Sequence, residues 1–192
     1  MKKYNVIYAD PPWSYDNKKM VGRFGNGEWD GAASSKYSLM TNEDISVMPI
    51  KEIIDKNAVC FIWATVPLMP EAFATLSAWG FEYKTMLTWR KIMSTGMGYW
   101  FRGQVEHLLV GVRGKVKPFR MQVCNFYQSK TGKHSQKPHY FRELISKAVE
   151  KSFEDVKKLE LFARSREGFF PDYEYEGWDV YGNEVNNSIV LT

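Results

Sequence analysis

A carboxylate, two prolines and a tryptophan stand together at Asp10, Pro11, Pro12 and Trp13, directly after the apolar run 5–9. The proline rings carry no N–H, so carbonyl oxygens in this turn stay available as acceptors beside the carboxylate. Acceptors without a competing donor suit an amino group that has two hydrogens to give. Trp13 adds a flat surface on which a planar ring can stack. The four residues therefore predict a pocket for the exocyclic amine of an aromatic base such as adenine.

The chemistry of such a pocket is activation of a weak nucleophile, because the lone pair of this amine is delocalised into the ring. Acceptors that pull on its hydrogens favour a tetrahedral nitrogen and stabilise the positive charge that develops as it attacks. A base paired inside a duplex cannot reach the pocket, so it must be flipped out or single-stranded. Two plainer interpretations stay open: Asp10 as a helix cap or turn former, and Trp13 as a structural residue on a turn.

A strand over 5–9 positions this motif, since the run is apolar and partly β-branched. We expect further strands at 58–65, 81–89, 105–112, 122–128, 157–163 and 178–184, and helices at 41–54, 67–80 and 137–152. Alternating strands and helices predict an α/β fold with a mostly parallel sheet and helices on both faces. Ligands bind such sheets at the carboxyl ends of the strands, where Asp10 stands.

The chain length of 192 residues predicts one domain across 1–192. The polar, glycine-rich segment at about 14–41 shows no sustained hydrophobic period, and we expect it to form a mobile loop over the substrate. Target recognition would then rest on this segment, on 93–104 and on the basic stretch 113–137, or on a second subunit.

Basic residues are concentrated in one part of the chain, because no Asp or Glu occurs from His107 to Arg142. Aromatic residues are interleaved with them, a pattern typical of a surface that binds a polyanion and stacks on bases. The candidate nucleic-acid-binding residues are Lys115, Lys117, Arg120, Lys130 and Lys133. A solvated basic face is the alternative.

Cysteine and histidine usage argues against a metal site and an oxidising compartment. Cys60 and Cys124 lie in apolar, strand-like runs, and we expect both to be buried free thiols in a reducing cytosol. Three scattered His and two distant Cys have no metal-ligand spacing, so we expect no metal. The sequence shows neither a signal peptide nor an apolar run near the roughly 18 residues of a membrane span. We therefore expect a cytoplasmic protein without membrane contact.

The motif DPPW at 10–13 resembles the catalytic motif of the MT-A-type adenine-N6 methyltransferases, the family of the catalytic subunit of the mRNA adenosine methyltransferase and its bacterial and phage relatives. The resemblance continues in family order along nearly the whole chain, through "GAASSKYSLM", "FIWAT", "WGFEYKTMLTW", "GMGYWFRGQVEHLLVGVRGK", "HSQKP", "LELFAR" and "GWDVYGNEV". It implies a Rossmann-like methyltransferase fold in which the catalytic motif precedes the donor-binding motifs. The compact form is similar to bacterial and phage members.

The resemblance also implies S-adenosylmethionine as methyl donor and a set of donor-binding residues. Lys137 in "HSQKP" resembles the lysine that meets the carboxylate end of the donor. Glu160 and Arg164 in "LELFAR" lie at the strand expected to cradle it. Asp10 would lie between the donor and the target amine and serve both.

Asn183 and Glu184 in "GNE" resemble the residues that address the ribose and adenosine part of the donor. Plainer roles stay open for these positions as well. Lys137 can be a solvated residue at a helix start, Arg164 can form a surface ion pair, and Asn183 can support a turn after Gly182.

These observations predict a site-specific, adenine-specific methyltransferase that methylates N6 of adenine in nucleic acid, DNA in preference to RNA, in a bacterial cell or phage-infected host. The alternatives are methylation of RNA adenine or of cytosine N4 in DNA, and a silent nucleic-acid-binding subunit. Silent subunits tend to lose the acid or the tryptophan, and here both stand. A homodimer or heteromeric partner stays open, because the aromatic, acidic insertion 165–176 is either a partner surface or a long loop.

Overall fold

A computed structural model describes residues 2–14, 40–92, 100–132, 136–164 and 175–191. The predicted substrate loop at 14–41 and the insertion at 165–176 lie almost entirely outside these ranges. The described strands are β1 (Tyr4–Ala9), β2 (Ile54–Thr65), β3 (Glu82–Ile92), β4 (Val105–Arg113), β5 (Phe126–Lys130), β6 (Lys158–Leu161) and β7 (Asp179–Tyr181). The described helices are α1 (Asn42–Val47), α2 (Ile50–Ile53), the short 3₁₀ helix η2 (Val66–Leu68), α3 (Met69–Ala78) and α4 (His139–Val149).

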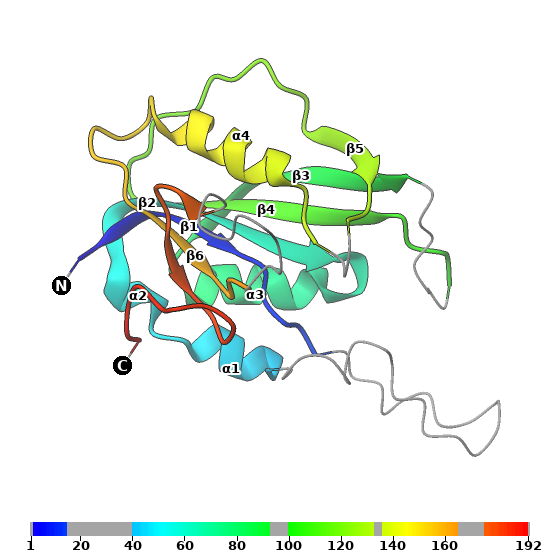
Figure 1. Cartoon of the computed structure of the whole chain (residues 1–192), viewed down its shortest axis with the longest axis horizontal. Coiled ribbons are helices and arrows are strands. Elements are labelled where there is room, and N and C mark those ends of the chain that lie inside the picture. Colours follow the sequence, from blue (N-terminus) through cyan, green and yellow to red (C-terminus); the bar gives the residue numbers. More distant parts are fainter. Residues whose placement is uncertain (1, 15–39, 93–99, 133–135, 165–174, 192) are drawn as a thin grey trace.

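All seven described strands belong to one sheet, in the order β5-β3-β4-β2-β1-β6-β7 (Figure 1). Every neighbouring pair is parallel except the two pairs that β4 makes with β2 and β3. The sheet is therefore mostly parallel, as the sequence predicts. Because β4 runs in the opposite direction, its first residues lie at the same edge of the sheet as the last residues of β1.

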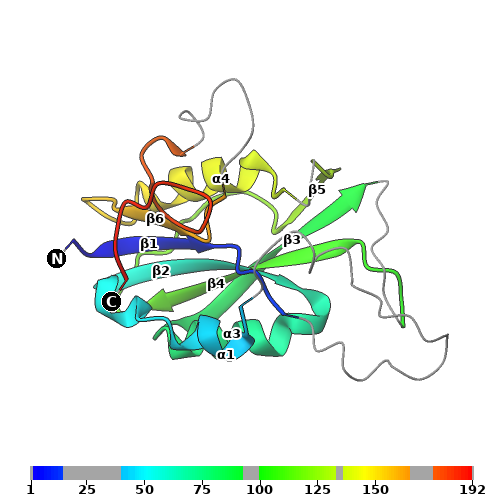
Figure 2. The same cartoon turned by 60° about the horizontal axis from the view of Figure 1, so that its bottom comes forward.

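Helices cover both faces of this sheet: α1 and α3 lie on one side and α4 lies on the other, in both views (Figures 1 and 2). Alternate residues of β1 point to opposite faces, as expected for a strand. Ile7 packs in the cluster on the α1–α3 side, and Tyr8 packs in the cluster that contains Phe141 and Ile145 of α4. Since both faces are buried, β1 reads as a nearly continuous apolar run.

The helix predicted over 41–54 is two short helices, α1 and α2. Thr41 caps α1, accepting a hydrogen bond from the backbone N–H of Asp44 at 3.0 Å. Pro49 separates α1 from α2, because a proline ring disfavours helical conformation in the residue before it. Strand β2 then begins at Ile54, four residues before the predicted start.

The prediction for 122–128 is wrong in position, because β5 covers Phe126–Lys130. Residues 114–125 instead form an irregular, largely exposed connection. The prediction that Cys124 is buried is wrong for the same reason: it lies in this connection and is exposed. Cys60 is buried in β2 as expected, and its burial raises the pKa of the thiol.

Candidate active site

Two residues predicted from separate motifs meet at the carboxyl edge of the sheet. Asp10 directly follows β1, and Lys137 stands just before α4, 127 positions along the chain. The Nζ of Lys137 donates to both carboxylate oxygens of Asp10, at 2.8 and 2.9 Å. Burial by itself would lower the pKa of Lys137, but Asp10 and Glu106 raise it above its ordinary value. The lysine is therefore a permanent cation at neutral pH.

Glu106 is a site residue that the sequence analysis did not identify. Its Oε2 lies 3.2 Å from Lys137 Nζ, and its Oε1 accepts a hydrogen bond from Lys91 of β3. Burial by itself would raise the pKa of Glu106, but Lys137 and Lys91 together lower it below its ordinary value. The sequence signal for this residue was an acid at the second position of an apolar strand. Only the reversed direction of β4 shows that this position lies at the edge of the sheet that holds Asp10.

Tryptophan rings support both lysines of this cluster. The ammonium of Lys137 lies 5.4 Å from the ring centroid of Trp63, and that of Lys91 lies 5.3 Å from the ring centroid of Trp89. The two rings pack edge to face with their centroids 6.1 Å apart. A cation over an aromatic face is stabilised by the ring quadrupole, more strongly where water is excluded. The rings therefore help to keep both cations in place.

Trp13 is buried rather than exposed, with 7% of its surface accessible. Its indole N–H donates to the backbone carbonyl of Trp63 at 2.9 Å, and its backbone N–H donates to the carbonyl of Pro11, also at 2.9 Å. These bonds fix the turn after Asp10. The backbone bond engages the Pro11 carbonyl, so a hydrogen bond from a ligand would have to use the other lone pair of that oxygen. Stacking of a base on Trp13 stays a prediction.

A cavity of about 320 Å³ lies beside this turn and brings together four of the predicted residues. These four are Pro12, Arg164, Asn183 and Glu184. The other lining residues are Met40, Met48, Phe162, Ala163, Tyr181 and Gly182. An apolar wall with a few convergent polar groups is typical of a small-molecule site.

Two backbone features shape the wall of this cavity. Phe162 has a φ of 61°, the left-handed region that side chains other than glycine rarely adopt. A Cβ at Gly182 would lie 2.1 Å from the carbonyl oxygen of Ala163, so only glycine permits this approach. The main chain here also bonds directly, because the N–H of Ala163 donates to the carbonyl of Tyr181 at 3.0 Å. Strained backbone of this kind is concentrated at ligand sites.

A comparison with protein families matches residues 4–184 to MT-A70. The chain belongs to the MT-A70 family. It is 31% identical to the Type II methyltransferase M.MunI of a Mycoplasma species, over 96% of this chain and 78% of that relative. It is 26% identical to the N(6)-adenosine-methyltransferase subunit METTL3 of Danio rerio and 25% identical to the METTL3 catalytic subunit of Homo sapiens. In both cases the match covers 98% of this chain and 29% of the relative, so the chain spans under a third of either METTL3 protein.

Membership of the MT-A70 family confirms the predicted fold class. The mostly parallel sheet with helices on both faces is the Rossmann-like fold of S-adenosylmethionine-dependent methyltransferases. Asp10 precedes Lys137, Arg164 and Asn183 in sequence, and their roles toward the donor stay predictions.

Glu160 of this MT-A70 chain does not line the cavity. Its carboxylate binds Arg142 of α4 through two hydrogen bonds, with Nε at 2.7 Å and Nη2 at 2.8 Å. Leu159 and Leu161 pack on the α1–α3 side of the sheet, so Glu160 between them points to the α4 side. A role for Glu160 toward the donor stays a prediction. The sequence signal for its partner was Arg142, an arginine among the apolar residues on the buried face of α4.

The predicted basic surface is divided between the two edges of the sheet. Lys130 ends β5 at the same edge as Asp10, whereas the backbone of Lys115 is bound by Asn57 near the start of β2. Ala9, the last residue of β1, pairs with Ile62 of β2. Asn57 lies five residues earlier on β2, so it is roughly 17 Å along the strand from the edge that holds Asp10. Lys133 lies outside the described residues.

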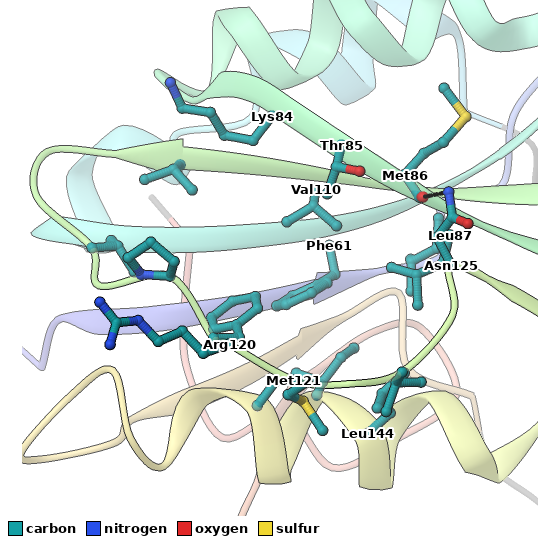
Figure 3. Close-up of a pocket in the computed structure, with 18 of the residues that line it drawn as sticks. Phe61, Lys84, Thr85, Met86, Leu87, Val110, Arg120, Met121, Asn125 and Leu144 are labelled. Carbon is teal, nitrogen blue, oxygen red and sulfur yellow. Dashed lines mark hydrogen bonds between the residues drawn. The ribbon is translucent and has the colours of Figure 1, made fainter.

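An apolar groove of about 980 Å³ lies between α4 and strands β3 and β4, covered partly by the connection 114–125 (Figure 3). Phe61 and Val110 line it from the sheet, Leu144 from α4, and Arg120 and Met121 from the connection. Lys115 and Lys117 of the connection also line it. The described lining holds no acid, so its chemistry does not suit an amine, and the Asp10 edge is the candidate active site.

Exposed aromatic residues precede β4, in the segment predicted to take part in recognition. Trp100 is 93% exposed and Phe101 is 89% exposed, and Arg102 follows them. Exposed rings beside a cation can stack on unpaired bases.

Two structural absences apply to the described parts of the chain alone. There, no three His, Cys, Asp or Glu side chains gather into a group that could hold a metal ion. Within the same residues, no helix has the length and apolar character needed to cross a membrane.

Proposed function

We propose that this chain transfers a methyl group from S-adenosylmethionine to N6 of adenine in nucleic acid, with DNA as the substrate rather than RNA. The observation that carries the proposal is the position of Asp10: it directly follows a central strand, is bound by Lys137, and stands two residues before Pro12 of the cavity wall. Family membership supports the chemistry. Higher identity to the Mycoplasma type II methyltransferase than to METTL3, and the larger share of that relative's own length that is matched, support the bacterial or phage side of the family.

The chemistry of the cavity fits the methyl donor. Asn183 and Glu184 offer an amide and a carboxylate, which suit ribose hydroxyls and adenine nitrogens. Arg164 lines the same cavity, and Lys137 supplies a cation for the donor carboxylate at the Asp10 end. When bound, the donor supplies an electrophilic methyl group.

The target amine needs an acceptor that Lys137 now occupies, since that lysine donates to both oxygens of Asp10. Turning Lys137 toward the donor carboxylate would release one Asp10 oxygen for an N–H of the amine. Asp10 and the second lone pair of the Pro11 carbonyl then hold the two amine hydrogens. The carboxylate stabilises the positive charge on the nitrogen as it attacks and lies within reach of the proton that the nitrogen later loses.

The test uses the purified chain and a donor with a radiolabelled methyl group. Unmethylated duplex DNA, single-stranded DNA and RNA are offered in parallel, and each product is digested to nucleosides. We expect label in N6-methyldeoxyadenosine. Label confined to RNA or to N4-methylcytosine would establish one of the alternative substrates. Donor binding by calorimetry without any label would instead support a subunit that is silent or needs a partner.

Asp10→Asn is the decisive variant, because it keeps the size of the side chain and removes the charge. We expect methyl transfer to fall by at least about 10³-fold, since removing one preorganised group of this kind costs 10²–10³ and the charge is lost as well. Donor affinity should change far less. Undiminished turnover by this variant would remove Asp10 from the catalytic role.

Nucleic-acid contacts are proposed for Lys115, Lys117, Arg120 and Lys130, and we place the protein in the cytoplasm of a bacterial cell or phage-infected host. A homodimer or a heteromeric partner would add to the surface that recognises the target. No metal takes part in the proposed reaction.

A further inference from the structure

Lys91, Glu106, Lys137 and Asp10 form a continuous chain of alternating charge that leads into the active site. Lys91 binds Glu106, Glu106 lies 3.2 Å from Lys137, and Lys137 lies 2.8 Å from Asp10. The side chains of Lys91, Glu106 and Lys137 are 18%, 8% and 13% exposed. Two cations therefore balance two anions in a place with little solvent, where each charge depends on its neighbours.

Lys91 is set back from the reacting groups. It belongs to β3, its backbone N–H donates to the carbonyl of Gln104 at 2.7 Å, and its ammonium lies over the ring of Trp89. The described structure links its side chain to Asp10 only through Glu106 and Lys137. Among the described residues, the contact route from Lys91 to Asp10 therefore runs through Glu106.

We propose that Lys91 is a positioning residue for the methyl donor: it occupies one oxygen of Glu106, so that Glu106 steadies Lys137 beside Asp10 without drawing it away. The inference rests on the proposed function, because Lys137 is taken to serve the donor. It names a residue of β3 that the cavity and the sequence motifs do not include.

The physical reason is competition between two carboxylates for one ammonium. With Lys91 present, Glu106 has a cation of its own, and Lys137 can give two of its three hydrogens to Asp10. Without Lys91, Glu106 and Asp10 share a single cation in a poorly solvated cluster that carries one surplus negative charge. Lys137 then moves toward Glu106, and the donor carboxylate meets a displaced cation and a more negative site.

The first experiment measures donor affinity by calorimetry, and donor KM and kcat, for Lys91→Met and Lys91→Arg. We expect Lys91→Met to raise the donor Kd and KM by about tenfold, within the range of coupling between residues of one charge network. The kcat should change by less than about threefold, since the bound donor itself holds Lys137. Arginine can still reach Glu106, so Lys91→Arg should stay within about twofold of the wild type.

Lys84→Met is the matched control, because Lys84 lies on the same strand and forms an exposed ion pair with Glu82. It removes one positive charge from β3 without touching the cluster, and we expect no change in donor Kd. An unchanged donor Kd in Lys91→Met, or an equal change in both variants, would overturn the proposal.

A second experiment does not depend on donor binding. Urea midpoints are measured for Lys91→Met, Asp10→Asn and the double variant. Side chains that do not contact one another usually have additive effects. Here the urea midpoint of the double variant should fall by less than the sum of the two single-variant decreases, because Asp10→Asn removes the surplus negative charge that Lys91→Met creates. Additive midpoints would overturn the positioning role. A wild type that binds no donor would instead refute the proposed function, and the urea cycle would still show whether Lys91 is coupled to Asp10 through the cluster.

Discussion

Glu160→Ala separates a structural role from a role toward the donor for a residue that the sequence analysis assigned to the donor. In the structure the Glu160 carboxylate makes two hydrogen bonds to the guanidinium of Arg142, and the two side chains are 9% and 6% exposed. The ring of Tyr175 lies 5.0 Å from the same guanidinium. The substitution therefore removes the carboxylate that both hydrogen bonds reach and leaves a buried cation beside it.

The expected loss is about 3–5 kcal/mol, the usual cost of removing one partner from a buried ion pair. With a urea slope of about 2 kcal/mol per molar, the unfolding midpoint should fall by roughly 1.5–2.5 M. The thermal midpoint should fall by roughly 6–20 °C for a chain of this size. Glu143→Ala is the control: Glu143 forms an exposed pair with His139, so its loss should cost under about 1 kcal/mol.

The assay is urea unfolding followed by tryptophan fluorescence, with donor affinity measured on every variant that remains folded. The double variant Glu160→Leu with Arg142→Met removes both charges and keeps apolar volume, so most of the stability should return. If Glu160 is structural, this double variant also binds donor normally. A stable double variant that has lost donor binding would refute the structural role and support the assignment from sequence.

Three further predictions concern the cavity, the charge cluster and the nucleic acid. Gly182→Ala forces a Cβ against a backbone carbonyl, so it should cost about 1–3 kcal/mol in urea unfolding and weaken donor binding. The pKa of Glu106 is lowered and that of Lys137 is raised, so the stability each charge adds is present between pH 4.5 and 10.5. The loss of unfolding free energy in Glu106→Gln should therefore shrink as the pH falls below 4.5 and passes the lowered pKa of Glu106. The loss in Lys137→Met should shrink as the pH rises above 10.5 and passes the raised pKa of Lys137. Lys130→Gln and Lys117→Gln should each lower the slope of log affinity against log salt by about 0.9 on duplex DNA, and an unchanged slope for Lys117→Gln would confine the DNA to the active edge.

Each of these measurements has a clear opposing result. A Gly182→Ala variant with wild-type midpoint and donor affinity would mean that the close approach at this turn is dispensable. If the loss of unfolding free energy in Glu106→Gln and Lys137→Met stays constant across the two pH ranges, neither charge contributes to stability.

The sequence by itself determined the fold class and the place of Asp10, the candidate catalytic residue. Alternation of strands with helices favours a mostly parallel sheet, and an acid directly after a buried strand such as Asp10 lies at a carboxyl edge, because both follow from local periodicity and chain direction. The predicted helix start at residue 41 is also confirmed, since Thr41 caps α1. The family resemblance predicted Lys137, Arg164 and Asn183 as residues that bind the methyl donor, and this assignment stays a prediction.

Only the tertiary structure decided which charges face one another. Glu106 lies at the same edge of the sheet as Asp10 because β4 is antiparallel to both of its neighbours. The direction of a strand is set by its pairing in the sheet rather than by its composition. The burial of Trp13 depends on a hydrogen bond from its indole N–H to the backbone carbonyl of Trp63, fifty positions away. Glu160 points away from the cavity because a strand sends alternate side chains to opposite faces, and α4 brings Arg142 to the face it occupies. Contacts between distant positions carry no local signal, so these partners emerge only when the chain is folded.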